Sequence, residues 1–453
     1  MGRTRNFLAA MLLAAVAMPA SAWGADRLVT GVQDPLDDVF HELDRDSAYQ
    51  VARGRGIRVV RVQVAWSGIA PERPDAPEDP ADPAYDWGWL DDRVAAIHQA
   101  GLEPLLTLYS APNWARLRQP DGSLRLAPRA DAFATFAGAA ARRYDGAFLG
   151  LPRVRYWQIW NEPNLPAYFS TRDTTVLYRA ILNAAYRSVH AAVADNTVIA
   201  GGTSPFAAGG LAPFDFMREL LSARSYFDVW SHHPYTQGGP SHQAVQENNA
   251  SIGDLSEMHR VLLAARRAHR ILSRGSPRFW VTEFSWETKP TDRSGVPLRV
   301  HGRWVAEALY RMWRDGVSLV SWFALRDGAP NGRELGFRLQ GGLYFRTTER
   351  YADERAKPAA RAFEFPFVAV PERGRVTLWG RTPDSRRHTV TVERRARGSW
   401  TRLKRIRTNA HGLFLFRRSG LEGDVLRARV GSARSLPFRA VHTRDRPTLP
   451  FGN

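Results

Sequence analysis

Short apolar runs that alternate with helical patterns dominate residues 28–365. Runs rich in β-branched and aromatic residues begin at eight positions: Leu28, Ile57, Leu102, Val154, Thr197, Phe227, Arg278 and Val317. Nearly continuous apolar strands are typical of a parallel sheet that is buried on both faces. Their starts lie about thirty to fifty residues apart, which leaves room for a helix and loops in each unit. Eight such units predict an α/β fold, a (β/α)8 TIM barrel with insertions.

The alternative to a barrel is an open, doubly wound sheet. That fold usually has a glycine-rich phosphate-binding turn after its first strand, and Gly31-Val32-Gln33-Asp34 lacks this composition. The segments between the apolar runs predict five helices, over residues 91–100, 131–144, 174–194, 256–270 and 304–315. Gly101 and Gly316 have the position of C-terminal helix caps, and Asp173 has the position of an N-cap.

The pattern changes after about Pro371. Short strands separated by turn residues are predicted over residues 375–381, 388–395, 400–407, 413–417, 424–430 and 435–441. Regular short strands with frequent turns are typical of a small antiparallel β-sandwich. We therefore expect a barrel domain over residues 27–366, a C-terminal β-sandwich over 371–441 and a flexible tail over 442–453.

The first residues have the pattern of an export signal. Arg3 and Arg5 precede an apolar run over residues 7–18, and Ala20-Ser21-Ala22 is a small-residue cleavage site. This order predicts a secretory signal peptide over residues 1–22, and an uncleaved anchor is the alternative. The run is too short for an ordinary membrane span, and no later stretch is long and apolar enough. We expect a secreted or extracytoplasmic protein without a transmembrane span after cleavage.

Composition narrows the functional classes. The 453 residues are 44% hydrophobic and 24% charged, which is globular composition, and 15 of them are Trp. The absence of Cys excludes a disulfide scaffold, an iron–sulfur cluster and a cysteine nucleophile. No metal-binding motif, P-loop or nucleophilic-serine motif is present, so we expect neither a metal nor another cofactor.

The net charge of +18 is concentrated near the C-terminus. Residues 371–453 contain 20 basic and 6 acidic residues, so they carry +14 of the total. This region can buttress the barrel, bind an anionic polymer such as an acidic glycan, or bind nucleic acid. We favour the buttress and then the anionic polymer, and we expect no nucleic-acid partner for an exported chain.

Two glutamates stand where a barrel would place its chemistry, directly after strands. Glu162 follows the fourth apolar run, in Trp160-Asn161-Glu162-Pro163, and Glu283 follows the seventh. Catalytic groups of a TIM barrel lie at the carboxyl ends of its strands. Because a carboxylate is costly to desolvate, two of them at these positions indicate function. The alternative for each is a loop glutamate that pairs with an arginine.

Trp-Asn-Glu-Pro after the fourth strand, with a second Glu after the seventh, resembles the clan of retaining (β/α)8 glycoside hydrolases, clan A. The resemblance covers residues 28–365. A finer likeness, to family 39 and PslG-like exopolysaccharide hydrolases, rests on three segments. They are His233-Pro234-Tyr235, Trp322 through Asp327, and Lys357 to Phe363 leading into Phe365-Pro366-Phe367.

The resemblance implies a role for each matching residue. Glu162 would be the general acid and base, and Glu283 the nucleophile that forms a glycosyl-enzyme. Asn161 would bind the sugar 2-hydroxyl, and Arg61 would keep the nucleophile ionised. Their alternatives are a turn asparagine and an arginine paired with another acid.

Several neighbours would support these groups. Tyr235 would orient the nucleophile, and His233 or His232 would bind sugar hydroxyls or tune the acid; the motif favours His233, and a core histidine is the alternative. Trp322 would form the floor of a sugar subsite, and Trp66 and Trp114 would line further subsites, with core packing as the alternative for all three.

The sequence thus predicts an exported retaining glycoside hydrolase that cleaves a β-linked polysaccharide or oligosaccharide by double displacement. The retaining mechanism predicts carboxyl groups about 5–5.5 Å apart. A carbohydrate-binding protein without hydrolytic activity and a transglycosylase are the alternatives.

Overall fold

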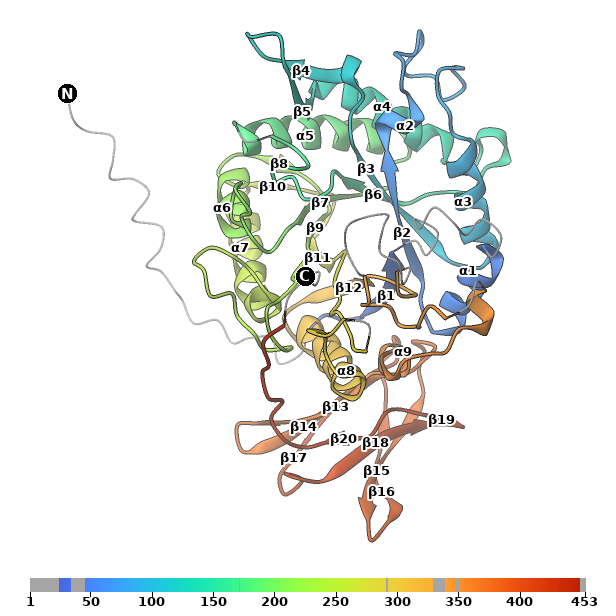
Figure 1. Ribbon diagram of the computed structural model, residues 1–453, viewed down its shortest axis with the longest axis vertical. Helices are drawn as coiled ribbons and strands as arrows, with labels where there is room; N and C mark the ends of the chain where they lie inside the picture. The colour runs from blue at the N-terminus through green and yellow to red at the C-terminus, as the bar shows by residue number, and fades with distance from the viewer. Residues whose placement is uncertain are drawn as a thin grey trace, which may run out of the picture.

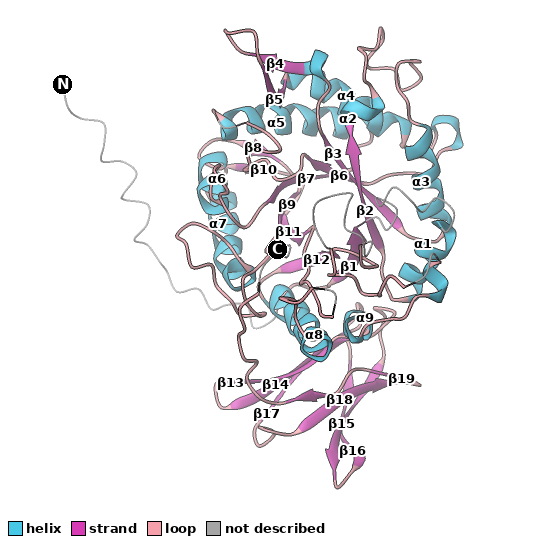
Figure 2. Ribbon diagram, in the orientation of Figure 1, coloured by secondary structure: helices cyan, strands magenta, loops and turns pink. Residues whose placement is uncertain are grey.

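The computed structural model describes residues 24–33, 45–170, 172–290, 292–328, 339–347 and 350–448. The predicted signal peptide, residues 1–22, lies outside the described residues. The chain forms a barrel ringed by helices, and antiparallel sheets from the C-terminal region lie beside it (Figures 1 and 2). No described helix has both the length and the apolar character needed to cross a membrane.

Eight parallel strands close the barrel, as the sequence predicts. In chain order they are β1 (Val29–Gln33), β2 (Val59–Ala65), β3 (Glu103–Tyr109), β6 (Tyr156–Ile159), β7 (Thr197–Thr203), β9 (Val229–His232), β11 (Arg278–Val281) and β12 (Val317–Trp322). Each begins within two residues of a predicted apolar run. β1 pairs with both β2 and β12, so the sheet has no open edge.

Helices surround the barrel. They are α1 (Arg45–Gly54), α2 (Trp66–Ile69), α3 (Gly88–Gln99), α4 (Ala130–Arg143), α5 (Thr174–Ala192), α6 (Pro213–Leu220), α7 (Leu255–Arg267), α8 (Leu298–Arg314) and α9 (Pro358–Glu364). Loops add the strand pairs β4 (Arg116–Arg118) with β5 (Leu124–Pro128), and β8 (Ser225–Tyr226) with β10 (Ile271–Leu272). Gly101 and Gly316 have positive φ after α3 and α8, as predicted for C-terminal caps.

Asp173 has the predicted N-cap position of α5, but it does not form the capping hydrogen bond. Asp173 precedes the helix, but its backbone is left-handed, with φ of 55°, and its side chain caps no backbone N–H. The carboxylate lies 3.6 Å from Arg125 instead. A partly exposed ion pair therefore stands in place of the capping bond that the sequence pattern favours.

The C-terminal region forms two antiparallel sheets. The first contains β13 (Phe367–Glu372), β14 (Arg375–Arg381) and β17 (Leu413–Arg418). The second contains β15 (Thr389–Ala396), β16 (Ser399–Arg407), β18 (Val425–Val430), β19 (Ala433–Arg434) and β20 (Phe438–Arg439). The strand predicted over residues 435–441 is shortened to β20, and β19 lies just before the predicted range. The sequence does not predict β13, because Pro371 interrupts its run. An edge strand tolerates this proline, and β14 is the one described strand with which β13 pairs.

The C-terminal sheets pack firmly against the barrel. Trp379 of β14 is fully buried, and its ring lies 5.4 Å from that of Trp313 in α8. Arg381 is also fully buried, and it donates to the carbonyl oxygens of Leu28 and Phe363 and to the hydroxyl of Thr30. One continuous hydrophobic core therefore runs from the barrel into the C-terminal sheets.

The predicted flexible tail does not hang free in its described part. Residues 442–448 have no regular secondary structure, but they run back along the barrel. The backbone N–H of Thr448 donates to the carbonyl of Gln237, and its hydroxyl donates to the carbonyl of Thr236. Oδ2 of Asp445 lies 2.9 Å from Nδ1 of His242, which belongs to the same loop as Thr236 and Gln237. The segment is thus tied to the loop that follows β9.

Candidate active site

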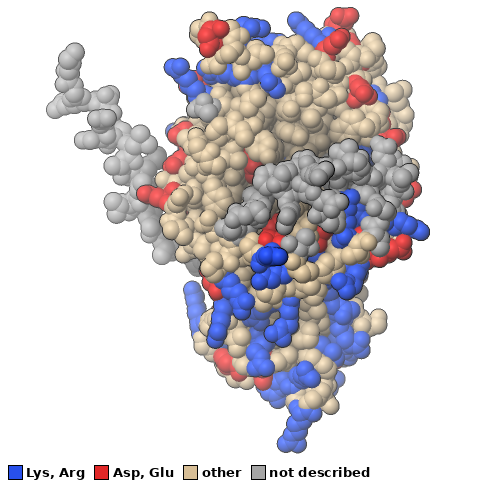
Figure 3. Space-filling model, in the orientation of Figure 1, with Lys and Arg blue, Asp and Glu red and all other residues tan. Residues whose placement is uncertain are grey.

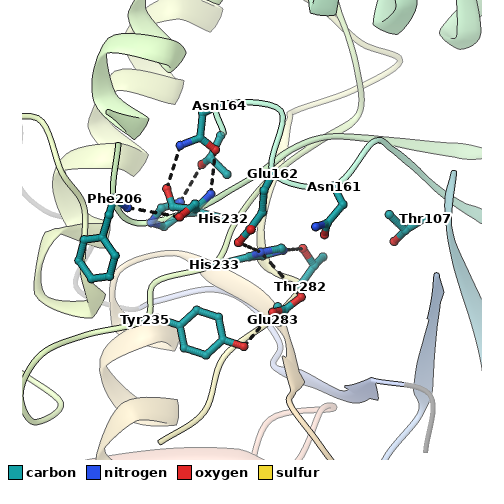
Figure 4. A network of polar contacts seen from close by, with 12 residues as sticks. Thr107, Asn161, Glu162, Asn164, Phe206, His232, His233, Tyr235, Thr282 and Glu283 are labelled. Atoms are coloured by element: carbon teal, nitrogen blue, oxygen red, sulfur yellow. Dashed lines mark hydrogen bonds and ion pairs between the residues drawn. The ribbon is translucent and has the colours of Figure 1, made fainter. Parts of the chain in front are cut away.

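The two glutamates lie at the same end of the barrel, after β6 and β11, and face one histidine (Figure 4). Nδ1 of His233 lies 3.0 Å from Oε1 of Glu162 and 3.9 Å from Oε2 of Glu283. These two carboxylate oxygens are therefore at most 6.9 Å apart, the sum of the two distances. Both carboxylates are largely buried: the side chain of Glu162 is 11% exposed and that of Glu283 is 12% exposed.

Glu162 stands on a strained turn. The φ angles of Trp160 and Glu162 are 70° and 42°, a left-handed region that costs about 1–3 kcal/mol for residues other than glycine. The turn is held by main-chain bonds: Trp160 donates to Leu108 and Glu162 donates to Gly202. Gly202 has a φ of 58°, and a Cβ there would lie 2.5 Å from the amide of Gln158. The glycine therefore lets the neighbouring strand approach and fix the acid.

Arg61 organises the other side of the site. It lies on β2, is fully buried, and its Nη1 donates to Oε2 of Glu283 at 2.8 Å. The same guanidinium donates to Gln33 and Thr107, which lie on the neighbouring strands β1 and β3. Its Nη2 donates to Oδ1 of Asn161 at 2.7 Å. The arginine is thus fixed by bonds on several sides before it reaches the carboxylate.

These contacts also set the chemistry of Asn161. Because Oδ1 accepts from Arg61, the Nδ2 group of this asparagine remains as its hydrogen-bond donor. Asn161 immediately precedes Glu162, so this donor stands beside the acid. The arrangement can donate to a substrate hydroxyl.

The two carboxyl groups have opposed environments. Burial raises the pKa of Glu162, the negative charge of Glu283 raises it further, and His233 only partly opposes this, so the pKa lies above the ordinary value. Burial alone would also raise the pKa of Glu283. The positive field of His233 and Arg61, with the hydroxyl of Tyr235, outweighs burial, and the pKa lies below the ordinary value. One carboxyl is thus poised to hold a proton and the other to stay ionised.

Tyr235 and His233 contact these carboxyls from the loop after β9. The hydroxyl of Tyr235 donates to Oε1 of Glu283 at 2.8 Å. His233 uses Nδ1 toward Glu162, and its Nε2 lies 3.1 Å from the hydroxyl of Thr282. His232 points elsewhere, to Thr203 and to the carbonyl of Ala250. Burial lowers the pKa of His232 to about 3, so it is a neutral core histidine.

Two of the three tryptophans predicted to bind sugar, Trp66 and Trp322, pack in the core instead. Trp66 is fully buried, with its ring stacked on Phe136 at 4.9 Å. Trp322 is only 1% exposed, and its Nε1 donates to the carbonyl of Gly341. Trp114 is half-buried, lies edge-on to Trp66 and donates to a backbone carbonyl. The packing alternative holds for Trp66 and Trp322, because a ring without exposed surface cannot stack on a substrate.

Sequence reasoning missed an aromatic residue at the site. Tyr168, in the loop after β6, is 40% exposed. Burial, followed by the charges of Glu162 and Glu283, raises its pKa to about 12, so the phenol lies within the field of both carboxylates. No local sequence signal distinguished Tyr168 from other loop tyrosines. It offers the exposed ring that Trp66 and Trp322 do not.

The segment around Lys357, one part of the finer resemblance, contacts two of the loops at the barrel end that carries the site. Lys357 is buried, and its Nζ donates to Asp327 at 2.5 Å and to the hydroxyl of Thr288. It thereby joins the loops that follow β11 and β12. Over the described residues, no group of three or more acidic or histidine side chains is placed to hold a metal ion.

Comparison with known proteins identifies the fold. No protein-family model matches the sequence, and no curated protein matches it. Solved structures do match, and they include a family 39 glycoside hydrolase from the gut symbiont Bacteroides cellulosilyticus WH2. It has 17% identity and a TM-score of 0.53, over 86% of this chain and 79% of that one.

Two further solved structures show the same architecture. A family 39 enzyme from Xanthomonas axonopodis pv. citri has 15% identity and a TM-score of 0.52, over 89% of this chain and 93% of that one. A glucosidase from Croceicoccus marinus has 13% identity and a TM-score of 0.52, over 90% and 97%. At this level of identity the matches establish a shared fold, the (β/α)8 barrel with accompanying β-structure, as the sequence predicts.

Proposed function

We propose that this protein is a retaining glycoside hydrolase that cleaves a β-linked saccharide by double displacement. The observation that carries the proposal is the pair of carboxyls held by one histidine, with Glu162 biased toward the protonated form and Glu283 toward the ionised form. Such a pair fits glycoside hydrolysis, in which one carboxyl protonates the leaving oxygen and the other attacks the anomeric carbon. The shared fold with family 39 enzymes supports it.

The spacing favours retention of configuration. Retaining enzymes have carboxyl groups about 5–5.5 Å apart, and inverting enzymes leave about 6.5–9.5 Å for a water molecule. The upper limit of 6.9 Å between Oε1 of Glu162 and Oε2 of Glu283 lies below most of the inverting range, which supports retention.

In the first step, Glu162 donates its proton to the leaving oxygen while Glu283 attacks. Arg61 and Tyr235 each hold one oxygen of Glu283, and Nδ2 of Asn161 is the donor for the sugar 2-hydroxyl. In the second step, Glu162, now ionised, takes a proton from water while the water oxygen attacks the anomeric carbon. The bond between that carbon and Glu283 breaks, which releases the sugar and restores the Glu283 carboxylate.

The direct test uses neutral and acidic β-glycans and small aryl β-glycosides, including the xyloside and glucoside. Wild type is compared with Glu283→Gln and with Glu219→Gln, which changes a glutamate of α6. We expect sugar release by wild type and the control, loss in Glu283→Gln, and a first-formed product with retained anomeric configuration by NMR. Full activity of Glu283→Gln would refute the nucleophile. Saccharide binding without release would favour the carbohydrate-binding alternative, and oligosaccharide products larger than the substrate would favour a transglycosylase.

We also propose export, on the pattern of residues 1–22. Intact-mass analysis of protein from the extracytoplasmic fraction is expected to show cleavage near Ala22. Protein that stays in the cytoplasm at full mass would refute this proposal.

A further inference from the structure

One face of the second C-terminal sheet carries an unusual density of arginines. Residues paired across neighbouring antiparallel strands point to the same side, so the register assigns each side chain to a face. Val390, Val392, Leu426 and Ala428 are fully buried and mark the inner face. The opposite face is defined here as the arginine face and contains Arg395, Arg402, Arg405, Arg407, Arg427, Arg429, Arg434 and Arg439.

The arginine face is open and poorly neutralised. Glu393 is the acidic residue that shares it, and this carboxylate is engaged by Arg427 and Arg429. Four other arginines of the face are exposed and make no ion pair with a described residue: Arg395, Arg402, Arg405 and Arg407. Figure 3 shows Lys and Arg gathered over this part of the molecule, with few acidic residues among them.

The spacing makes these charges act together. Arg405 and Arg407 are two residues apart on one strand, which places them about 7 Å apart, and adjacent strands lie about 5 Å apart. These distances are shorter than the screening length of about 8 Å at physiological salt. The repulsion within the face is therefore only partly screened, and a partner with repeated negative charges would relieve it.

Aromatic surface on the same face favours a glycan. Trp400 is half-buried, and the guanidinium of Arg427 lies 4.1 Å from the centre of its ring. A flat ring beside arginine forks can contact the apolar side of a sugar while the arginines bind its carboxylates. Single-stranded nucleic acid usually requires several aromatic platforms for successive bases, whereas Trp400 is the only aromatic residue that the described strand pairing places on this face.

We propose that the arginine face is a docking surface for an acidic polysaccharide, which it holds near the barrel. The choice of glycan over nucleic acid rests on Trp400 and on the proposed function. The surface itself rests on the charge and register of the sheet.

The experiment uses the full chain, because the hydrophobic core is continuous between barrel and sheets. Four arginines of the face are changed together, as Arg395→Gln, Arg402→Gln, Arg405→Gln and Arg407→Gln. The control variant makes the same change of net charge at four exposed barrel arginines: Arg73, Arg260, Arg267 and Arg299. Binding is measured by affinity electrophoresis with polygalacturonate, with neutral hydroxyethylcellulose, and with a DNA duplex as competitor.

We expect wild type and control to bind polygalacturonate in a salt-sensitive manner and not to bind the neutral polymer. The face variant is expected to bind at least about tenfold more weakly, because four exposed charged contacts are lost together. Equal losses in both variants would overturn the proposal, because net charge alone would explain them. No binding by wild type, or DNA that competes as well as free polygalacturonate, would also overturn it.

Activity on a small aryl glycoside separates this proposal from the proposed function. The face variant is expected to keep that activity, since none of its changes lies near the carboxylates. An inactive wild type that binds polygalacturonate through these arginines would refute the hydrolase and leave the surface standing.

Discussion

Replacing Tyr235 with Phe removes the tyrosine hydroxyl that donates to the proposed nucleophile, Glu283. The lost bond is the 2.8 Å donation to Oε1 of Glu283, and the phenylalanine ring keeps the packing against Phe284. A hydrogen bond to a charged group contributes about 1.5–3 kcal/mol. The ionised form of Glu283 loses this stabilisation, and the protonated form does not.

The sign follows from the role of the group. Glu283 acts as the ionised carboxylate, and its pKa is lowered in the folded protein by His233, Arg61 and Tyr235 against the effect of burial. Activity is therefore present above this pKa and is lost as the pH falls through it. Removing the hydroxyl raises the pKa and moves the acidic limb of the pH–rate profile to higher pH. At pH values below that limb, kcat/KM is expected to fall by about 10- to 150-fold relative to wild type.

The assay is kcat/KM against pH on an aryl glycoside that wild type cleaves. Tyr310→Phe is the matched control, because Tyr310 is also a buried tyrosine, and its hydroxyl donates to the carboxylate of Glu372, on β13 of the C-terminal sheets. The control is expected to lower stability without moving either limb. A Tyr235→Phe profile with an unmoved acidic limb and a uniform loss at every pH would refute the reasoning.

Three further changes test other contacts. Glu162→Gln is expected to lower kcat by about 10²- to 10⁴-fold for a poor leaving group and much less for an activated phenol that needs no proton; equal losses across a leaving-group series would contradict its role as the acid. His233→Gln is expected to move both limbs of the pH profile to higher pH, because His233 lowers the pKa of both Glu162 and Glu283; a shift of either limb to lower pH would contradict the assigned network. Arg381→Met is expected to destabilise the protein by about 1–3 kcal/mol in thermal or urea unfolding, because the buried carbonyl of Leu28 loses its charged donor, while the pH profile stays unchanged; an unaltered unfolding midpoint would show that these bonds contribute nothing.

The barrel could be predicted from the sequence because its strands are buried on both faces. An apolar run such as that of β12, which is buried at every position, needs no periodicity to be recognised. β13 escaped because Pro371 breaks the local pattern, and only the tertiary context, an edge position, makes it a strand. The docking of segment 442–448 could not be predicted for a similar reason, since its hydrogen bonds reach residues about two hundred positions earlier in the chain.

The candidate site was only partly readable. The sequence indicated both glutamates because each is a charged residue at the end of a predicted strand. It indicated Arg61 because this residue is a charge inside an apolar run. Its contacts with Gln33 and Thr107 depend on how β1, β2 and β3 are aligned, which no local pattern encodes. Tryptophan is equally suited to a core and to a cleft, so residue type alone could not place Trp66 or Trp322.

Arg381 makes the C-terminal sheets difficult to transplant. The charge of Arg381 lies in the interior of the protein. The oxygens that accept its hydrogen bonds belong to Thr30 of β1, to Leu28 just before β1, and to Phe363 of α9. A recombination event that moved these sheets to another barrel would bury a cation without acceptors, unless the recipient offered three oxygens in the same places. Barrel and sheets are therefore expected to be inherited together, as one evolutionary unit and not as exchangeable cassettes.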